Sequence, residues 1–288
     1  MTIAFLNGQY LPLDEARISP MDRGFLFGDG IYEVIPSYGG KAVGLAAHLE
    51  RMNNGLAELE IKNPYRDQEY QQIISTLILR NKSKLASDNI GVYLHVSRGT
   101  DTKRFHAYPK HITATIFAFA FEISPPPPAD RKLVKGLKVS LCEDLRWHRC
   151  HIKSTALLGN VMHFEHGQRQ GNQETILYNR ERQVTEASSS NVFVVDNGVI
   201  RTPPLDNQLL PGITRKLALE SFKREGLVFS ESVVTVRELL NAQEVWLTSS
   251  SKEISPVIEV DGHKVGSGRP GPVWERAIQA YNKYKFSC

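Results

Sequence analysis

The chain has 288 residues, of which 41% are hydrophobic, 9% aromatic and 23% charged, which is typical of globular proteins and excludes disordered and fibrous classes. Its 35 Lys and Arg residues against 31 Asp and Glu residues give a net charge of +4. A balance this close to neutral does not indicate nucleic acid or an anionic membrane as the main partner.

Targeting and membrane signals are weak. The longest apolar-leaning run, Ile112 to Phe121, is about half the length that a membrane-spanning helix needs. The first eight residues lack the charged and apolar regions of a signal peptide. Three cysteines, Cys142, Cys150 and Cys288, are too few for a disulfide framework. We therefore expect a cytoplasmic enzyme or binding protein.

The length corresponds to about two domains, and a proline-rich segment predicts where they divide. Ser124–Asp130 contains four consecutive prolines, which favour an extended polyproline stretch and cannot lie inside a helix or a central strand. We interpret residues 123–130 as a linker. It separates a smaller domain, residues 1–122, from a larger one, residues 131–288.

The first domain shows alternating signals for strands and helices. Asn7-Gly8 between two apolar runs predicts a β-hairpin, because both turn residues of such a hairpin need positive φ. Apolar residues at helical spacing predict helices from about His48 and across Tyr70–Leu79. Strands are predicted at Ile90–Ser97 and His111–Phe121. This order favours an α+β domain with mixed or antiparallel pairing.

The second domain is predicted to be richer in strands. Helices are expected after Lys153, at Thr214–Arg224 and near the C-terminus around Ile278. The expected strands are Gly136–Leu145, Glu174–Asn179, Asn191–Val195, Val199–Thr202, a run around Val233, and Val245–Ser249. This pattern favours a barrel-like sheet.

Leu210–Arg215 has the features of a phosphate site. A Pro-Gly turn leads directly into a predicted helix, so the N–H groups of Ile213 and Thr214 would lie free at its positive end. The cluster Thr248–Ser251, which includes Ser249 and Ser250, could supply further donors. An ordinary helix cap and an ordinary loop are the alternatives.

Lys153 is a candidate for covalent chemistry. It stands between a predicted strand and a predicted helix, beside the apolar Ile152 and Ala156. A partly buried lysine loses its proton readily and could form a Schiff base. The alternative is a solvated surface charge. The nearby His148, Cys150 and His151 match no zinc-binding spacing, so no metal site is expected.

Charged residues elsewhere could bind other parts of a ligand. Glu186 precedes a hydroxyl-rich turn and could hold a pyridine nitrogen in its protonated state by charge pairing. Arg104 and His106 are two residues apart, so on an extended segment both side chains face one side and could bind a carboxylate together. The alternative for each is a solvated surface charge.

Taken together and in this order, these residues resemble the class IV (fold-type IV) pyridoxal-phosphate aminotransferases, and within them the D-amino acid aminotransferases. The resemblance runs from Met21 to Gly262. Its most specific motifs are Arg23–Glu33, Ile152–Ser154, Val184–Phe193 and Pro211–Arg215. It implies an α+β fold of two domains, with a small α/β N-terminal domain and a larger barrel-like C-terminal domain.

The resemblance also implies residue roles. Lys153 would bind pyridoxal 5'-phosphate as a Schiff base and later carry the proton, and Glu186 would pair with the pyridine nitrogen. The phosphate would be bound by Arg51, Ile213, Thr214, Ser249 and Ser250. The substrate carboxylate would be bound by Tyr32, Arg104 and His106. In this family the last two come from the neighbouring subunit, so a homodimer is implied.

The implied reaction is a ping-pong transfer of the amino group from D-alanine to 2-oxoglutarate, giving pyruvate and D-glutamate. Branched-chain L-amino acid aminotransferases typically carry Tyr five residues beyond the lysine, where this chain has Leu158. The segment Gly99–Arg104 is one residue longer than the family pattern. The alternatives are a branched-chain aminotransferase, an aminodeoxychorismate lyase and a ligand-binding relative without turnover.

Overall fold

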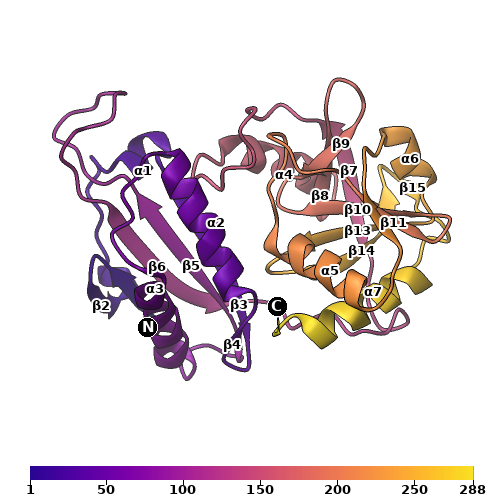
Figure 1. The fold of residues 1–288 in the computed structure, drawn as a ribbon, viewed down its shortest axis with the longest axis horizontal. Helices are drawn as coiled ribbons and strands as arrows, with labels where there is room; N and C mark the ends of the chain where they lie inside the picture. The colour runs from indigo at the N-terminus through magenta and orange to yellow at the C-terminus, as the bar shows by residue number, and fades with distance from the viewer. Residues whose placement is uncertain (288) are drawn as a thin grey trace. The chain divides into compact units, whose positions relative to one another are not determined.

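The computed structural model describes residues 1–287 (Figure 1), and Cys288 lies outside the described residues. Internal contacts divide the chain into two units. Unit 1 is Met1–Pro125 together with Ile152–Leu157, and unit 2 is Pro126–His151 together with the chain from Leu158 onward. The segment with Lys153 thus belongs to unit 1. The sequence-based division at residues 123–130, as a statement about domains that fold independently, stays a prediction.

Unit 1 contains a six-stranded antiparallel sheet in the order β2-β1-β6-β5-β3-β4. The hairpin at Asn7-Gly8 is confirmed, since both residues have positive φ and Leu6 pairs with Gln9. The strands are β1 (Ile3–Leu6), β2 (Gln9–Pro12), β3 (Gly30–Tyr38), β4 (Lys41–Ala42), β5 (Asn89–Ser97) and β6 (Thr115–Glu122). A 3-10 turn, η1 (Leu13–Glu15), and three helices, α1 (Arg23–Phe27), α2 (Leu45–Glu58) and α3 (Asp67–Asn81), complete the unit.

The core of unit 1 lies between its sheet and the helices α2 and α3, both visible beside the sheet in Figure 1. Leu49 and Met52 of α2 and Leu77 of α3 are fully buried in this core with Ile31 and Val92 of the sheet. Because side chains alternate between the two faces of a strand, the neighbours of these sheet residues face the other way. That second face carries the aromatic side chains Tyr32, Tyr93, Phe117, Phe119 and Phe121, whose rings are 5.3–5.8 Å from their neighbours.

Unit 2 contains a nine-stranded mixed sheet. Its order is β12-β11-β10-β13-β14-β7-β8-β9, and β15 pairs with β14. The strands are β7 (Leu137–Glu143), β8 (Glu174–Tyr178), β9 (Val184–Ala187), β10 (Asn191–Asp196), β11 (Val199–Thr202), β12 (Phe229–Glu231), β13 (Glu244–Ser249), β14 (Glu253–Val260) and β15 (His263–Lys264). The helices are α4 (Leu158–Arg169), α5 (Ile213–Arg224), α6 (Val236–Asn241) and α7 (Pro272–Tyr284).

Five strands, β3, β4, β9, β14 and β15, were not predicted, and one predicted strand is displaced. β3 was missed because Glu33, Pro36 and Ser37 interrupt its apolar pattern, and β9 is only four residues long. The strand predicted around Val233 forms earlier, as β12, which ends at Glu231. The Val233 carbonyl accepts a hydrogen bond from Arg201 at 2.6 Å. The strand predicted from His111 begins only at Thr115. Within residues 1–287, no helix is long and apolar enough to cross a membrane.

Candidate active site

Lys153 is attached to β3 through its main chain. The amide of Tyr32 donates a hydrogen bond to the Lys153 carbonyl at 3.1 Å, and the amide of Thr155 donates to the Gly30 carbonyl at 2.9 Å. Ile31 and Ser154 form a bridge between these two bonds. The Lys153 side chain then places Nζ 4.1 Å from the centre of the Tyr32 ring. Two predicted site residues that are distant in sequence therefore lie together.

The close approach of this segment depends on Gly28. Gly28 ends α1 in the left-handed conformation, with φ of 67°. A Cβ at this position would lie 2.8 Å from Cα of Ala156. Only glycine both adopts this φ without strain and leaves room for the segment that carries Lys153.

Arg51 lies in a buried polar group on the helix side of β3. Its Nε donates to Oε1 of Glu33 at 2.8 Å and its Nη2 to Oε2 at 2.7 Å, so the pair is bidentate. Nδ1 of His48 lies 2.7 Å from Oε2 of the same carboxylate. Glu33 is fully buried, yet Arg51 and His48 outweigh the effect of burial and lower its pKa to about 2. Burial lowers the pKa of His48, so we assign a neutral imidazole with Nδ1–H as the donor.

Arg104 and His106 lie on the loop between β5 and β6, residues 98–114, which we call the β5–β6 loop. Both side chains are exposed. Cζ of Arg104 is 5.2 Å from the centre of the Phe27 ring, and the His106 ring is 5.3 Å from it. The two residues that were predicted to act together therefore share one aromatic contact in α1.

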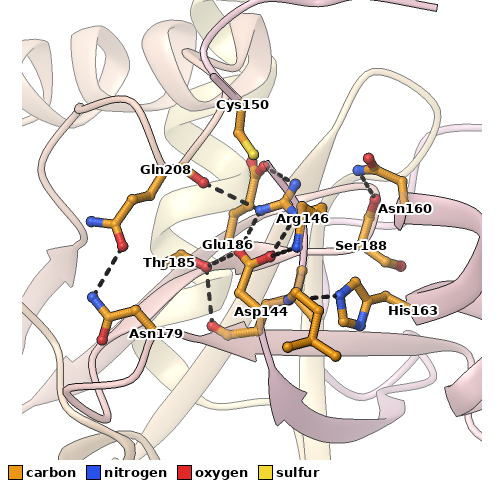
Figure 2. A network of polar contacts seen from close by, with 12 residues as sticks. Asp144, Arg146, Cys150, Asn160, His163, Asn179, Thr185, Glu186, Ser188 and Gln208 are labelled. Carbon is orange, nitrogen blue, oxygen red and sulfur yellow. Dashed lines mark hydrogen bonds and ion pairs between the residues drawn. The ribbon is translucent and has the colours of Figure 1, made fainter. Parts of the chain in front are cut away.

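Glu186 on β9 accepts hydrogen bonds at both carboxylate oxygens. Nη1 of Arg146 donates to Oε1 at 2.6 Å, and the Asn191 side chain and the Leu210 amide donate to Oε2 at 3.2 and 3.0 Å. Figure 2 shows that the same guanidinium also binds both oxygens of Asp144. Burial raises the pKa of Glu186, and Arg146 opposes that rise. The carboxyl is thus a stronger proton acceptor than an ordinary glutamate.

The structure contains unsatisfied donors where a phosphate was expected. Helix α5 begins at Ile213, and its N-cap residue Gly212 offers no side-chain hydrogen bond to the first turn. At the end of β13, the hydroxyls of Thr248 and Ser249 are buried and have no hydrogen-bond partner among the described residues. Leaving a buried hydroxyl unpaired costs about 1–3 kcal/mol. An anion that accepts from these groups would remove this cost, so they fit the phosphate of the implied cofactor.

Asn191 links these donors to Glu186. Its side-chain amide donates to both Glu186 and the Leu210 carbonyl, and its main chain pairs with Thr248 of β13. A Cβ on Gly212 would collide with the Asn191 side-chain oxygen, so the turn before α5 packs directly on this residue. Sequence analysis gave no role to Asn191 or to Arg146.

The predicted site residues divide between the two units. Unit 1 holds Tyr32, Arg51, Arg104, His106 and Lys153, and unit 2 holds Glu186, Ile213, Thr214, Ser249 and Ser250. Ser250 is half-buried in the turn after β13. Among residues 1–287, no three His, Cys, Asp or Glu side chains converge to form a possible metal site.

Comparison with known proteins identifies the family. A family model described as amino-transferase class IV matches residues 30–260. The chain belongs to the class IV aminotransferases. This class IV aminotransferase is 38% identical to the D-alanine aminotransferase of Staphylococcus haemolyticus, with 99% of this chain and 98% of the relative covered. It is also 38% identical to the D-alanine aminotransferase of Bacillus licheniformis, with 93% and 91% covered.

Solved structures of branched-chain aminotransferases share the fold. The branched-chain aminotransferase of Thermoproteus uzoniensis has a TM-score of 0.86 and 22% identity, and covers 99% of this chain and 95% of its own. The Escherichia coli branched-chain amino acid aminotransferase has a TM-score of 0.85, also with 22% identity, and covers 99% and 94%. The fold-type IV architecture that the motifs implied is confirmed.

Proposed function

We propose that this class IV aminotransferase uses pyridoxal 5'-phosphate to transfer the amino group of D-amino acids to 2-oxo acids. D-alanine and 2-oxoglutarate would give pyruvate and D-glutamate. The observation that carries the proposal is the attachment of Lys153 to β3, which holds its amine against Tyr32. The similarity to D-alanine aminotransferases over nearly the whole chain supports the substrate class.

Lys153 both binds the cofactor and moves the substrate proton. The bound cofactor supplies an electron sink for the bond that breaks at the substrate's Cα. The Lys153 amine would hold the cofactor and, in its free form, would accept the proton from the substrate's Cα. Once this amine has taken up the proton, the Tyr32 ring, 4.1 Å from Nζ, favours one orientation of the resulting ammonium by a cation–π contact.

The remaining predicted residues would bind the cofactor and orient it. Glu186 accepts a hydrogen bond from the protonated pyridine nitrogen, because Arg146, Asn191 and Leu210 fix the direction of its carboxylate. The α5 N–H groups of Ile213 and Thr214 bind the phosphate with the hydroxyls of Ser249 and Ser250. Arg51, oriented by its two hydrogen bonds to Glu33, would contact the same phosphate.

Arg104, His106 and Tyr32 bind the substrate carboxylate, and this decides the preferred enantiomer. The Cα–H bond must face Lys153, so the side that holds the carboxylate selects D or L. Two charge-assisted contacts of roughly 1.5–3 kcal/mol each allow a preference of at least tenfold.

The test is turnover of D-alanine and L-leucine with 2-oxoglutarate, compared by kcat/KM. We expect D-alanine to be faster by at least about tenfold. Equal or faster turnover of L-leucine would instead favour a branched-chain aminotransferase, with the role of Lys153 unaffected.

We further propose a cytoplasmic homodimer in which the β5–β6 loop of each subunit serves the site of its neighbour. A heterodimer of one Lys153→Ala subunit and one Arg104→Ala subunit tests this. If the loop acts on the neighbour, one of the two sites keeps both residues, and about half of the wild-type activity remains. If the loop acts within its own chain, neither site is complete and activity is lost.

A further inference from the structure

Asp22 and Arg23 are adjacent charged residues to which the proposed chemistry gives no role. Each is only 2% exposed. Burial of a charged side chain is unfavourable unless the charge is paired and hydrogen-bonded. The partners of these two side chains therefore indicate what they do, and both sets of partners lead to the β5–β6 loop.

Arg23 holds the middle of the loop. Its Nη1 donates to the carbonyls of Phe105 at 2.6 Å and Ala107 at 3.4 Å, and its Nη2 donates to the carbonyl of His106 at 3.2 Å. These are three consecutive residues, and they follow Arg104 directly. Nε of Arg23 donates to Asp29 at 2.8 Å, which fixes the guanidinium plane.

Asp22 holds the two ends of the same loop. Its Oδ1 accepts from the hydroxyl of Ser97, the last residue of β5, at 2.7 Å. Its Oδ2 accepts from the hydroxyl of Thr115, the first residue of β6, at 2.6 Å. The Arg23 amide adds a bond to the Gly99 carbonyl at 2.9 Å.

The side chains of the loop also rest on the helix that Asp22 caps. Oδ1 of Asp22 accepts from the Gly24 amide at 2.8 Å, at the start of α1. Phe27, at the end of α1, lies 4.9 Å from Cζ of Arg23 and contacts both Arg104 and His106. Long loops without secondary structure are uncommon and usually functional, and this one is fixed at its ends and at its middle.

We propose that Asp22 and Arg23 are positioning residues for substrate recognition: they fix the backbone of the β5–β6 loop so that the exposed Arg104 and His106 present a preformed carboxylate site. This inference rests on the proposed function of Arg104 and His106. A preformed site avoids the cost of ordering the loop each time a substrate binds. Asp22 and Arg23 should therefore affect turnover only of substrates that carry a carboxylate.

The test compares D-alanine with D-alaninamide, in which a neutral amide replaces the carboxylate, as substrates of the cofactor-loaded enzyme. In Arg23→Gln we expect kcat/KM for D-alanine to fall about tenfold or more, mainly through KM, while kcat/KM for D-alaninamide changes little. The preference for the acid over the amide therefore falls. Arg23→Lys keeps the charge but not the planar set of donors, so it should lie between wild type and Arg23→Gln.

Arg98→Gln is the matched control. Arg98 is buried and binds the same Asp29, but its other hydrogen bonds go to the carbonyls of Leu59 and Glu60. Arg98 is the first residue of the loop, and its guanidinium lies over the ring of Tyr108, beyond His106. The carbonyls of Phe105, His106 and Ala107 are bound by Arg23 instead. A comparable loss of stability with an unchanged acid-to-amide preference is expected. If Arg23→Gln lowers turnover of both substrates equally, its role is structural and the inference is wrong.

Arg104→Ala separates this inference from the function on which it rests. If Arg104→Ala leaves the acid-to-amide preference unchanged, the loop does not bind the carboxylate and the proposed function is wrong at this point. If Arg104→Ala lowers the preference and Arg23→Gln does not, only the inference fails. Should Arg23→Gln not fold, the isosteric Thr115→Val removes one bond to Asp22. It should lower the same preference by a smaller factor, and no change would overturn the inference.

Discussion

The amide of Tyr32 donates to the carbonyl of Lys153, while the Lys153 amine lies over the Tyr32 ring. Two independent contacts thus join these residues, one through the main chain and one through the side chains. The main-chain bond remains when the lysine side chain is shortened. A variant at this position should therefore lose chemistry without losing structure.

Lys153→Ala should abolish transamination and leave the melting temperature close to that of the wild type. Borohydride reduction of the wild-type protein with its cofactor, followed by peptide mapping, should label Lys153. Lys41→Ala, an exposed lysine on β4, serves as the control and should keep full activity. A label on any other lysine would refute the assignment.

Glu186→Gln should reduce kcat much more than cofactor affinity. A neutral amide cannot hold the proton on the pyridine nitrogen, so the barrier rises, whereas the phosphate contacts are unaffected. The measurements are kcat and the Kd of the cofactor, the latter from its absorption. Equal losses in both quantities would contradict this role.

Loss of Arg51 should have the opposite effect and mainly weaken cofactor binding. A simple Arg51→Ala variant would also leave the buried Glu33 without its bidentate partner, which costs about 3–5 kcal/mol. Glu33→Gln/Arg51→Met removes the charge pair together, and Glu33→Gln alone is the control. A raised Kd of the cofactor in the double variant, but not in the control, is the expected result.

Glu33 should make the protein less stable in acid. Its folded pKa of about 2 lies below the ordinary value of 4.5. The stabilisation is therefore complete above pH 4.5 and is lost as the pH falls from 4.5 towards 2. A shift of this size corresponds to roughly 3 kcal/mol.

Urea unfolding of the wild type and of Glu33→Gln at pH 4.5 and pH 3 measures this contribution. The wild type should lose more unfolding free energy than the variant over this interval. Parallel losses in the two proteins would show that another group is responsible.

Cys142 and Cys150 should react slowly with iodoacetamide at pH 8. Nε2 of His163 accepts from the Leu145 amide, so the His163 proton is on Nδ1, which donates to Sγ of Cys142. Burial raises the pKa of Cys142 to about 11 and that of Cys150 to about 12, which leaves little thiolate. Mass spectrometry of both peptides in folded and urea-unfolded protein measures the rates. Equal rates in the two states would contradict this prediction.

Local sequence patterns correctly predicted those elements that depend only on neighbouring residues in the chain. The Asn7-Gly8 hairpin and the start of α5 after Pro211-Gly212 depend on backbone preferences of adjacent residues. The strand predicted around Val233 is displaced: β12 ends at Glu231, and beyond it Arg201 binds the Val233 carbonyl.

The site depended on relationships that no local pattern contains. A charged residue is ordinarily taken to be exposed, so Arg23 and Arg146 were overlooked although both stand in or beside the quoted motifs. Their partners, the Phe105–Ala107 carbonyls and Glu186, lie far along the chain. One signal that could have pointed to Arg23 was the run Met21–Glu33, because its charged and glycine residues do not follow the periodicity of an amphipathic helix or strand.

The membership of Ile152–Leu157 in unit 1 bears on the order in which the protein is made. When the ribosome has released only the first 125 residues, the amide of Tyr32 and the carbonyl of Gly30 still lack the partners that Lys153 and Thr155 provide. The nascent N-terminal unit therefore carries an unpaired strand end until residue 155 has left the exit tunnel. Lys153 arrives with the last segment of that unit, so the hydrogen bonds at this end of β3 are completed only when Lys153 and Thr155 have emerged.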